Sequence, residues 1–367
     1  MRRSFMNVLI LTGRFGMGHY SVASSLANDI QKSFDGVHIT VQDIFEYSLR
    51  NHCNTLYGAY SFMINKGSRL YGMMYKCTEN SRINTKLPFH NYFFSAFRQL
   101  ISAVKPDIII STLPFCSHMV SQYKKKYVCS VPLITCITDV SSHSEWIHPN
   151  TDIYLVASSS IRQALIRKGV KESSIFVNGI PVKEQFKQIC RPQESNEKNL
   201  LIMGGGFGLL PKKKSFYEKI NRLEGVKTTV ITGNNKELFH KLYAKYENIE
   251  VIGFTDQVYR YMHKADLIIS KPGGITLFET IFSELPILAF KPDLPQELKN
   301  AVFIKNNRIG EVLSQNEKNY IDEIVDLLYD DKKLFELKKN MRAIKNSIDT
   351  NAIEKALSSM QRRGAYA

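Results

Sequence analysis

Two glycine-rich segments hold the residues that are best suited to chemistry in this chain. The first, Gly13-Arg14-Phe15-Gly16-Met17-Gly18-His19, follows a short apolar run and precedes a helical pattern. Glycines let a backbone approach a ligand closely, and a helix N-terminus favours negative charge. A histidine there is suited to proton transfer near neutral pH, although a lone histidine can also be structural. The third glycine and the downstream acidic residue of a dinucleotide fingerprint are missing, so we exclude NAD binding.

The second segment, Lys271-Pro272-Gly273-Gly274-Ile275-Thr276-Leu277-Phe278-Glu279, is more specific. A strand ends here and a helix begins, so unpaired N–H groups and the positive end of the helix dipole would face a diphosphate. Glu279 falls about one turn into the helix, where its carboxylate can accept hydrogen bonds from ribose hydroxyls. No Asp-x-Asp follows a strand in the manner of metal-dependent sugar transferases. We therefore expect a nucleotide-sugar site with no metal and no other cofactor.

Two further segments of the C-terminal half also follow predicted strands. Gly204-Gly205-Gly206-Phe207-Gly208 is another candidate cradle for a phosphate or a sugar. Pro292–Asn300 (PDLPQELKN) carries polar donors and acceptors of the kind that recognise sugar hydroxyls.

Alternating strands and helices must position these segments. Helical spacing predicts helices over residues 21–34 and 160–168, and short apolar runs predict parallel strands at 7–12, 38–42, 107–111, 132–138, 153–157, 175–177, 199–203, 227–232, 249–252, 266–270 and 286–290. This pattern predicts two doubly wound α/β domains, at 1–183 and 199–345. A polar linker is expected at 184–198, and a C-terminal helix at 346–367 is expected to return to the first domain. The arrangement is typical of the GT-B architecture, in which two Rossmann-like domains face an interdomain cleft, although some epimerases, phosphorylases and dehydrogenases share it.

The composition favours an anionic partner. The formal net charge is +15, although a basic proteome or simple solubility would also explain it. No basic helix or aromatic sheet motif supports binding of nucleic acid, which we exclude. The segment 52–104 interleaves aromatic residues, methionines and cations. That mixture suits the headgroup region of an anionic bilayer, and a pair of core helices is an equal alternative.

The chain is expected to be cytoplasmic and peripheral on the inner face of the cell membrane. No run approaches the roughly 18 apolar residues of a membrane-spanning helix. The six cysteines form no C-x-x-C pair, which favours reduced thiols.

Taken in order, the motifs resemble glycosyltransferase family 28, in the branch of monogalactosyldiacylglycerol synthases and processive diacylglycerol β-glucosyltransferases. The resemblance extends from Leu9 to about Gly310. It is carried by Gly16-Met17-Gly18-His19, Thr138-Asp139 with His143 and Trp146, Gly179-Ile180-Pro181-Val182 with Phe186, Met203–Gly208, Gly253-Phe254-Thr255, Met262, Ala265-Asp266 and Lys271–Glu279.

The resemblance implies an inverting transfer of a hexose from UDP-glucose or UDP-galactose to a hydroxyl of diacylglycerol. It implies His19 or Asp139 as the catalytic base. It implies acceptor-side residues Gly16, Gly18, His143 and Trp146. It implies a donor site made of Gly205, Gly206, Phe254, Lys271, Gly273, Gly274, Thr276, Glu279, Gln296, Glu297 and Asn300.

The chain departs from the family pattern in two places. Leu294-Pro295-Gln296-Glu297 has no glycine where the family usually has P-G-Q-E. The sugar is recognised near this loop, so glucose and galactose both stay open. Arg14 replaces a small residue and adds a cation on the acceptor side. Two alternatives therefore remain: a related transferase acting on a lipid-linked peptidoglycan precursor or a secondary metabolite, or a UDP-sugar-binding regulator with little catalysis.

Overall fold

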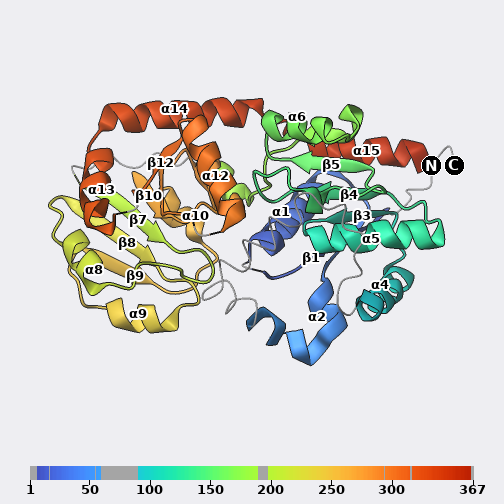
Figure 1. Ribbon diagram of the computed structural model, residues 1–367, viewed down its shortest axis with the longest axis horizontal. Helices are drawn as coiled ribbons and strands as arrows, with labels where there is room; N and C mark the ends of the chain where they lie inside the picture. The colour runs from blue at the N-terminus through green and yellow to red at the C-terminus, as the bar shows by residue number, and fades with distance from the viewer. Residues whose placement is uncertain are drawn as a thin grey trace. The chain divides into compact units, whose positions relative to one another are not determined.

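The fold comprises two parallel sheets, as the sequence predicts, and each sheet has six strands (Figure 1). The computed structural model describes residues 6–15, 17–53, 55–58, 90–188, 197–292, 294–314 and 316–364, with the backbone alone at 51, 90 and 361–364. The chain divides into two compact units. Met1–Pro181 and Ile348–Ala367 form the first, and Val182–Ser347 forms the second.

The first sheet has the strand order β2-β1-β3-β4-β5-β6. Its strands are β1 (Met6–Thr12), β2 (Val37–Asp43), β3 (Ile108–Ser111), β4 (Leu133–Cys136), β5 (Ile153–Val156) and β6 (Ile175–Val177). The strand order reverses between β1 and β3, which pair in parallel. In open α/β sheets, ligands bind beyond the carboxyl ends of the strands at such a reversal. The segment that carries His19 follows β1 at this place.

The helices of the first unit connect and cover this sheet. They are α1 (Gly18–Ser33), α2 (Ile44–Leu49), α4 (His90–Val104), α5 (Pro114–Tyr127), α6 (Ser159–Arg167) and α15 (Ala352–Gly364), with short 3₁₀ turns η1 (Arg50–His52), η2 (Ser144–Trp146) and η3 (Glu172–Ser174). The apolar face of α4 buries Phe93, Phe94 and Phe97. The C-terminal helix α15 contacts α1, β5 and β6.

The second sheet has the strand order β12-β11-β10-β7-β8-β9. Its strands are β7 (Lys198–Met203), β8 (Val226–Ile231), β9 (Ile249–Ile252), β10 (Leu267–Ser270), β11 (Ile287–Ala289) and β12 (Gly310–Val312). The order reverses between β7 and β10, which pair in parallel. Both glycine segments of the C-terminal half therefore follow neighbouring strands at the reversal point.

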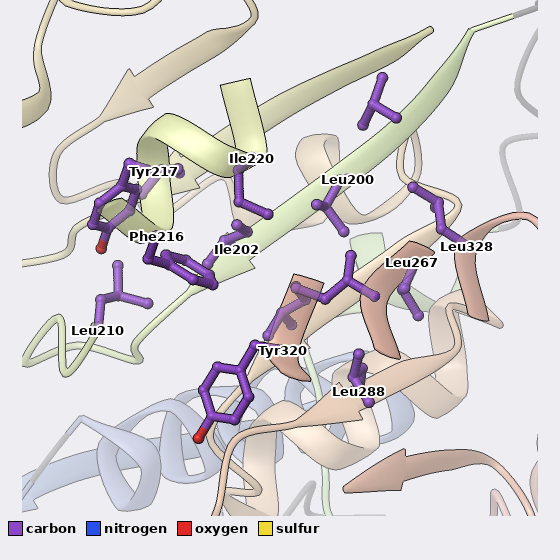
Figure 2. Close-up of a cluster of buried hydrophobic side chains, with 14 of the residues drawn as sticks. Leu200, Ile202, Leu210, Phe216, Tyr217, Ile220, Leu267, Leu288, Tyr320 and Leu328 are labelled. Atoms are coloured by element: carbon purple, nitrogen blue, oxygen red, sulfur yellow. The ribbon is translucent and has the colours of Figure 1, made fainter. Parts of the chain in front are cut away.

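The second unit also contains α7 (Glu184–Lys187), α8 (Lys214–Asn221), α9 (Lys236–Leu242), α10 (Val258–Met262), α11 (Gly274–Ser283), α12 (Pro295–Asn306), α13 (Tyr320–Leu328) and α14 (Asp331–Ser347), with the 3₁₀ turn η4 (Glu317–Asn319). Figure 2 shows part of its core, with labelled side chains from β7, α8, β10, β11 and α13: Leu200, Ile202, Phe216, Tyr217, Ile220, Leu267, Leu288, Tyr320 and Leu328. Full burial of each large apolar side chain contributes about 1.5–3 kcal/mol, which fixes the strands that carry the site.

The structure differs from the sequence expectations in several details. The first helix begins at Gly18 rather than at residue 21, and strand β12 was not predicted. The polar stretch 184–198 contains the short helix α7 and the first residue of β7, while 189–196 lies outside the described residues. Most of the aromatic and methionine-rich segment, residues 59–89, also lies outside them. Within the described part of the chain, no helix is both long and apolar enough to cross a bilayer.

Candidate active site

His19 is held by the ends of three neighbouring strands. It lies in the first turn of α1, after β1. Its Nδ1 atom is 2.9 Å from the carbonyl oxygen of Thr112, which follows β3. The same Nδ1 is 2.8 Å from the Oγ1 atom of Thr138, which follows β4. A carbonyl oxygen can only accept, so Nδ1 carries the ring proton and Nε2 of the neutral ring has a free lone pair.

The surroundings of His19 keep the imidazole neutral. Burial lowers the pKa of His19 to about 4, and the hydrogen bond to the Thr112 carbonyl opposes this shift only in part. The Trp146 ring lies nearby, with ring centroids 6.4 Å apart. Within the described residues, no hydrogen bond to the Nε2 atom is present. The arrangement can therefore accept a proton at Nε2 at physiological pH.

The other acceptor-side residues lie in different environments. Asp139 follows Thr138 and is half-buried. The side chains of His143 and Trp146 are buried, at 0% and 1% exposure. The Nδ1 atom of His143 accepts a hydrogen bond of 3.2 Å from the Glu145 N–H at the start of η2. Because the side chains of His143 and Trp146 present almost no accessible surface, their direct contact with an acceptor stays a prediction. Gly16 lies outside the described residues.

The glycine loop after β7 is a tightly packed turn with one open position. Gly208 has φ +61°, and a Cβ there would lie 1.9 Å from the Thr232 carbonyl oxygen. Asn234 donates a backbone hydrogen bond of 3.0 Å to the Gly206 carbonyl, which ties this loop to the one after β8. Gly205 has φ +67°, and a Cβ there would meet nothing within 4 Å. The backbone at Gly205 is thus open to a ligand.

The N-terminus of α11 is also open. Gly273 is its N-cap residue and supplies no side-chain cap. The Leu277 N–H bonds to the Gly273 carbonyl. Within the described residues, the N–H groups of Gly274, Ile275 and Thr276 have no partner. A helix terminus of this kind binds phosphate groups well, because its N–H groups and its dipole both favour an anion.

Glu279, on α11, is a half-buried carboxylate that makes no hydrogen bond and no ion pair within the described residues. Burial raises its pKa to about 7, while the charge of Lys183 acts in the opposite direction. Lys183 is not among the site residues that the sequence predicts. Its Nζ atom donates a hydrogen bond of 3.0 Å to the Asp256 carbonyl, near Phe254, which is 57% exposed. The available signal was a cation directly after the Gly179–Val182 motif.

The start of α12 is attached to the Lys271–Gly273 segment. Asn300 is fully buried and its Nδ2 atom donates a hydrogen bond of 2.8 Å to the Pro272 carbonyl. Glu297 accepts a hydrogen bond of 3.3 Å from the Leu294 N–H, and its Oε1 atom lies 3.8 Å from Lys271 Nζ. The Oε1 atom of Gln296 is buried, with no hydrogen-bond partner in the described structure. This unpaired oxygen could accept a hydrogen bond from a sugar hydroxyl.

Among the described residues, no three His, Cys, Asp or Glu side chains are grouped as a metal site requires. The structure brings His19 together with Thr112, Thr138 and Trp146 in the first unit. In the second unit it brings together the predicted donor residues Lys271, Glu297 and Asn300 around Pro272.

Comparisons with known proteins match both units. Residues 19–182 match the family described as monogalactosyldiacylglycerol (MGDG) synthase, and residues 199–356 match the glycosyltransferase family 28 C-terminal domain. The processive diacylglycerol beta-glucosyltransferase of Bacillus licheniformis is 30% identical, over 95% of this chain and 93% of its own. The protein of the same name from Bacillus subtilis is also 30% identical, over 91% of this chain and 90% of its own.

Solved structures share this fold over nearly the whole chain. The crystal structure of MurG from Acinetobacter baumannii matches with a TM-score of 0.63 at 15% identity, over 97% of this chain and 99% of that one. The likeness identifies the fold as GT-B.

Proposed function

Because this chain belongs to glycosyltransferase family 28, in the branch of monogalactosyldiacylglycerol synthases and processive diacylglycerol β-glucosyltransferases, we propose that it transfers a hexose from a UDP-sugar to a hydroxyl of diacylglycerol at a membrane surface. The names of its relatives supply the acceptor class. The observation that carries the proposal is the neutral, oriented His19, whose Nδ1–H is bound by the Thr112 carbonyl. Its free Nε2 lies beyond the strand ends at the reversal point of the sheet.

The proposed reaction is a single displacement that inverts the anomeric carbon. The Nε2 atom of His19 accepts the proton of the acceptor hydroxyl while the oxygen attacks that carbon. The bond between the sugar and the UDP oxygen breaks, and UDP leaves with the electron pair. The pKa of the ring, about 4, makes it a weak base, so proton transfer accompanies attack rather than preceding it. Asp139 remains the second candidate, as the base or as a group that orients it.

The second unit supplies the proposed donor site. The open N–H groups at the start of α11 and the backbone at Gly205 and Gly206 would hold the diphosphate. Glu279 would accept hydrogen bonds from the ribose, and the exposed ring of Phe254 would contact the uracil ring of UDP. Gln296 and Glu297 would face the sugar. Asn300 is fully buried and would support the donor site through its hydrogen bond to the Pro272 carbonyl. The helix terminus and Lys271 supply the positive charge that a metal supplies elsewhere, so we propose a metal-independent reaction.

The identity of the transferred sugar can be tested with labelled donors. The names of the relatives favour glucose as the transferred sugar. Residues 291–297 depart from the family pattern, so galactose is tested as well. Labelled UDP-glucose and UDP-galactose are offered separately, with diacylglycerol in anionic vesicles, in the presence and absence of EDTA. A labelled glycolipid that forms equally well with EDTA is the expected result, and it names the sugar.

The opposite result is equally informative. If UDP binds but neither donor labels any lipid, the diacylglycerol acceptor is wrong. An acceptor screen with lipid extracts then separates a transferase with another acceptor from a UDP-sugar-binding regulator.

A further inference from the structure

We infer that Tyr57 is a positioning residue for the acceptor side, because its hydroxyl anchors the loop that leads from β1 to His19. This loop ends at Met17, directly before α1, and the structure describes its residues 13–15 and 17. The inference rests on the proposed function, which places the loop and His19 on the acceptor side. Tyr57 lies in none of the motifs that carry the family resemblance.

A chain of hydrogen bonds connects the loop to the end of β2. The Arg14 N–H donates to the Tyr57 hydroxyl at 2.9 Å. That hydroxyl donates to Asp43 Oδ2 at 2.6 Å. The other oxygen of Asp43 accepts from the N–H groups of Phe45 and Glu46, at 2.9 and 3.1 Å, and caps α2. The carboxylate is buried, at 3% exposure. Because the hydroxyl both accepts and donates, its position and its hydrogen are fixed.

Aromatic packing holds the same loop from its side chains. The Phe15 ring contacts Phe45 and Tyr57 edge-on, with centroids 4.9 Å apart in both pairs. A Cβ at Gly13 would lie 3.1 Å from the Phe45 ring, so the backbone is pressed against it. The guanidinium of Arg14 lies 4.8 Å from the Tyr20 ring centroid and 3.4 Å from Glu46 Oε2. The Tyr57 hydroxyl is therefore one of several restraints on this loop, and it acts on the main chain at Arg14.

The loop needs such restraints because its last residue is strained. Met17 has φ +66°, in the left-handed region that residues with side chains rarely adopt. It lies two residues before His19, and its carbonyl accepts the Ser21 N–H at 2.9 Å inside α1. Strained conformations persist only where the surroundings hold them. If the Arg14 anchor is removed, Met17 can relax, and the start of α1 with His19 shifts.

The test is Tyr57→Phe, which removes the hydroxyl and keeps the ring. The matched control is Tyr92→Phe, since the Tyr92 hydroxyl also forms a hydrogen bond with the main chain of the first unit, in this case by donating to the Ser48 carbonyl at 2.5 Å. We expect kcat/KM for diacylglycerol to fall about tenfold in Tyr57→Phe, the effect of one lost hydrogen bond. The KM for the donor and the UDP affinity should not change. Tyr92→Phe should match the wild type.

A loss of folded protein has a different signature. It would lower the apparent kcat while both KM values stay unchanged, and UDP titration of active sites would reveal it. Asp43→Asn keeps an acceptor for the α2 cap but weakens the same Tyr57–Asp43 hydrogen bond that Tyr57→Phe removes. The losses of the two variants should therefore be less than additive when they are combined. Additive losses, wild-type kinetics in Tyr57→Phe, or an equal loss in Tyr92→Phe would each overturn the inference.

A second readout requires no turnover. Titration of the His19 ring by NMR, assigned with His19→Asn, should place its pKa near 4 in the wild type. In Tyr57→Phe it should move back toward about 6.5, because a looser loop admits water to the ring. An unchanged His19 titration would contradict the inference even if diacylglycerol proved to be the wrong acceptor. If the wild type has no transferase activity but Tyr57→Phe still shifts the His19 pKa as expected, the result would count against the proposed function alone.

Discussion

At the scale of single residues, the tautomer of His19 determines what its substitution should do. Since Nδ1 is occupied by the Thr112 carbonyl, only Nε2 can take a proton from an acceptor. His19→Asn should lower kcat by roughly 10²–10⁴, the usual contribution of a general base. UDP affinity, measured by calorimetry, should stay the same because the donor residues lie in the other unit. Replacement of the exposed His38 is the control. If His19→Asn keeps full turnover and Asp139→Asn loses it, Asp139 is the base.

Glu279 should make UDP binding depend on pH. Its pKa is raised to about 7, mainly by burial, so the carboxylate ionises between about pH 6 and 8. The ionised form accepts two hydrogen bonds from ribose hydroxyls, whereas the protonated form has lost one acceptor site. UDP affinity should therefore rise with pH across this range. Glu279→Gln should remove the part of the pH dependence that belongs to this group. A rise that is equally steep in Glu279→Gln would mean that the pH dependence belongs to the nucleotide.

The same residue should affect stability in the absence of UDP. The fold favours the protonated carboxyl, so its stabilising contribution is full below pH 4.5 and is lost as the pH rises through about 7. Glu279→Gln should therefore have a higher melting temperature than the wild type at pH 8 and a smaller difference at pH 5. A lower melting temperature for Glu279→Gln than for the wild type at pH 8 would show that the ionised Glu279 carboxylate is stabilised by a partner in the folded protein.

The sequence identified residues whose chemistry lies in their own side chains. His19, Glu279 and Gln296 could be selected because their types and neighbours are informative. It could not reveal the Thr112 carbonyl that orients His19, because every residue has a carbonyl and 93 positions separate the two. The partnership of Tyr57 with Arg14 and Asp43 is equally hidden, since it depends on how β1 and β2 pair.

At the scale of elements, α11 should bind phosphate through its backbone. A Cβ at Gly273 would meet only Thr276 Oγ1, at 3.9 Å, so Gly273→Ala should fold with an unchanged melting temperature. The added methyl group would stand before the open N–H groups of the helix. We expect UDP to bind about tenfold more weakly, the loss of about one charge-assisted hydrogen bond. Gly58→Ala, where a Cβ would meet nothing within 4 Å, is the control. Wild-type UDP affinity in Gly273→Ala would exclude this helix terminus as the diphosphate site.

Apolar strands were easier to predict than a short strand without an apolar run. The runs in β3 and β10 are apolar and buried on both faces, and such runs stand out in a sequence. Strand β12 has only three residues, Gly310–Val312, and no apolar run. Its glycine is needed because a Cβ there would lie 1.9 Å from the Ile287 carbonyl oxygen of β11. That requirement is set by tertiary packing, which a local pattern cannot contain.

At the scale of the whole molecule, each unit has its own parallel sheet, and the candidate residues are divided between them. The proposed base lies in the unit built on β1–β6, and the proposed donor residues lie in the unit built on β7–β12. Each half can therefore be tested with its own readout: UDP binding for one, and acceptor kinetics or the His19 titration for the other.

The net charge of +15 should direct the whole protein to anionic lipid. A cationic protein is attracted to an anionic surface by about 1 kcal/mol for each Lys or Arg near it, and salt screens this attraction. In sedimentation with vesicles, we expect binding to mixtures rich in phosphatidylglycerol at about 0.1 M salt, and much weaker binding at about 0.5 M. Vesicles of phosphatidylcholine alone provide the uncharged control. Binding that is equal on both lipids and insensitive to salt would mean that apolar contact, and not charge, brings the enzyme to its acceptor.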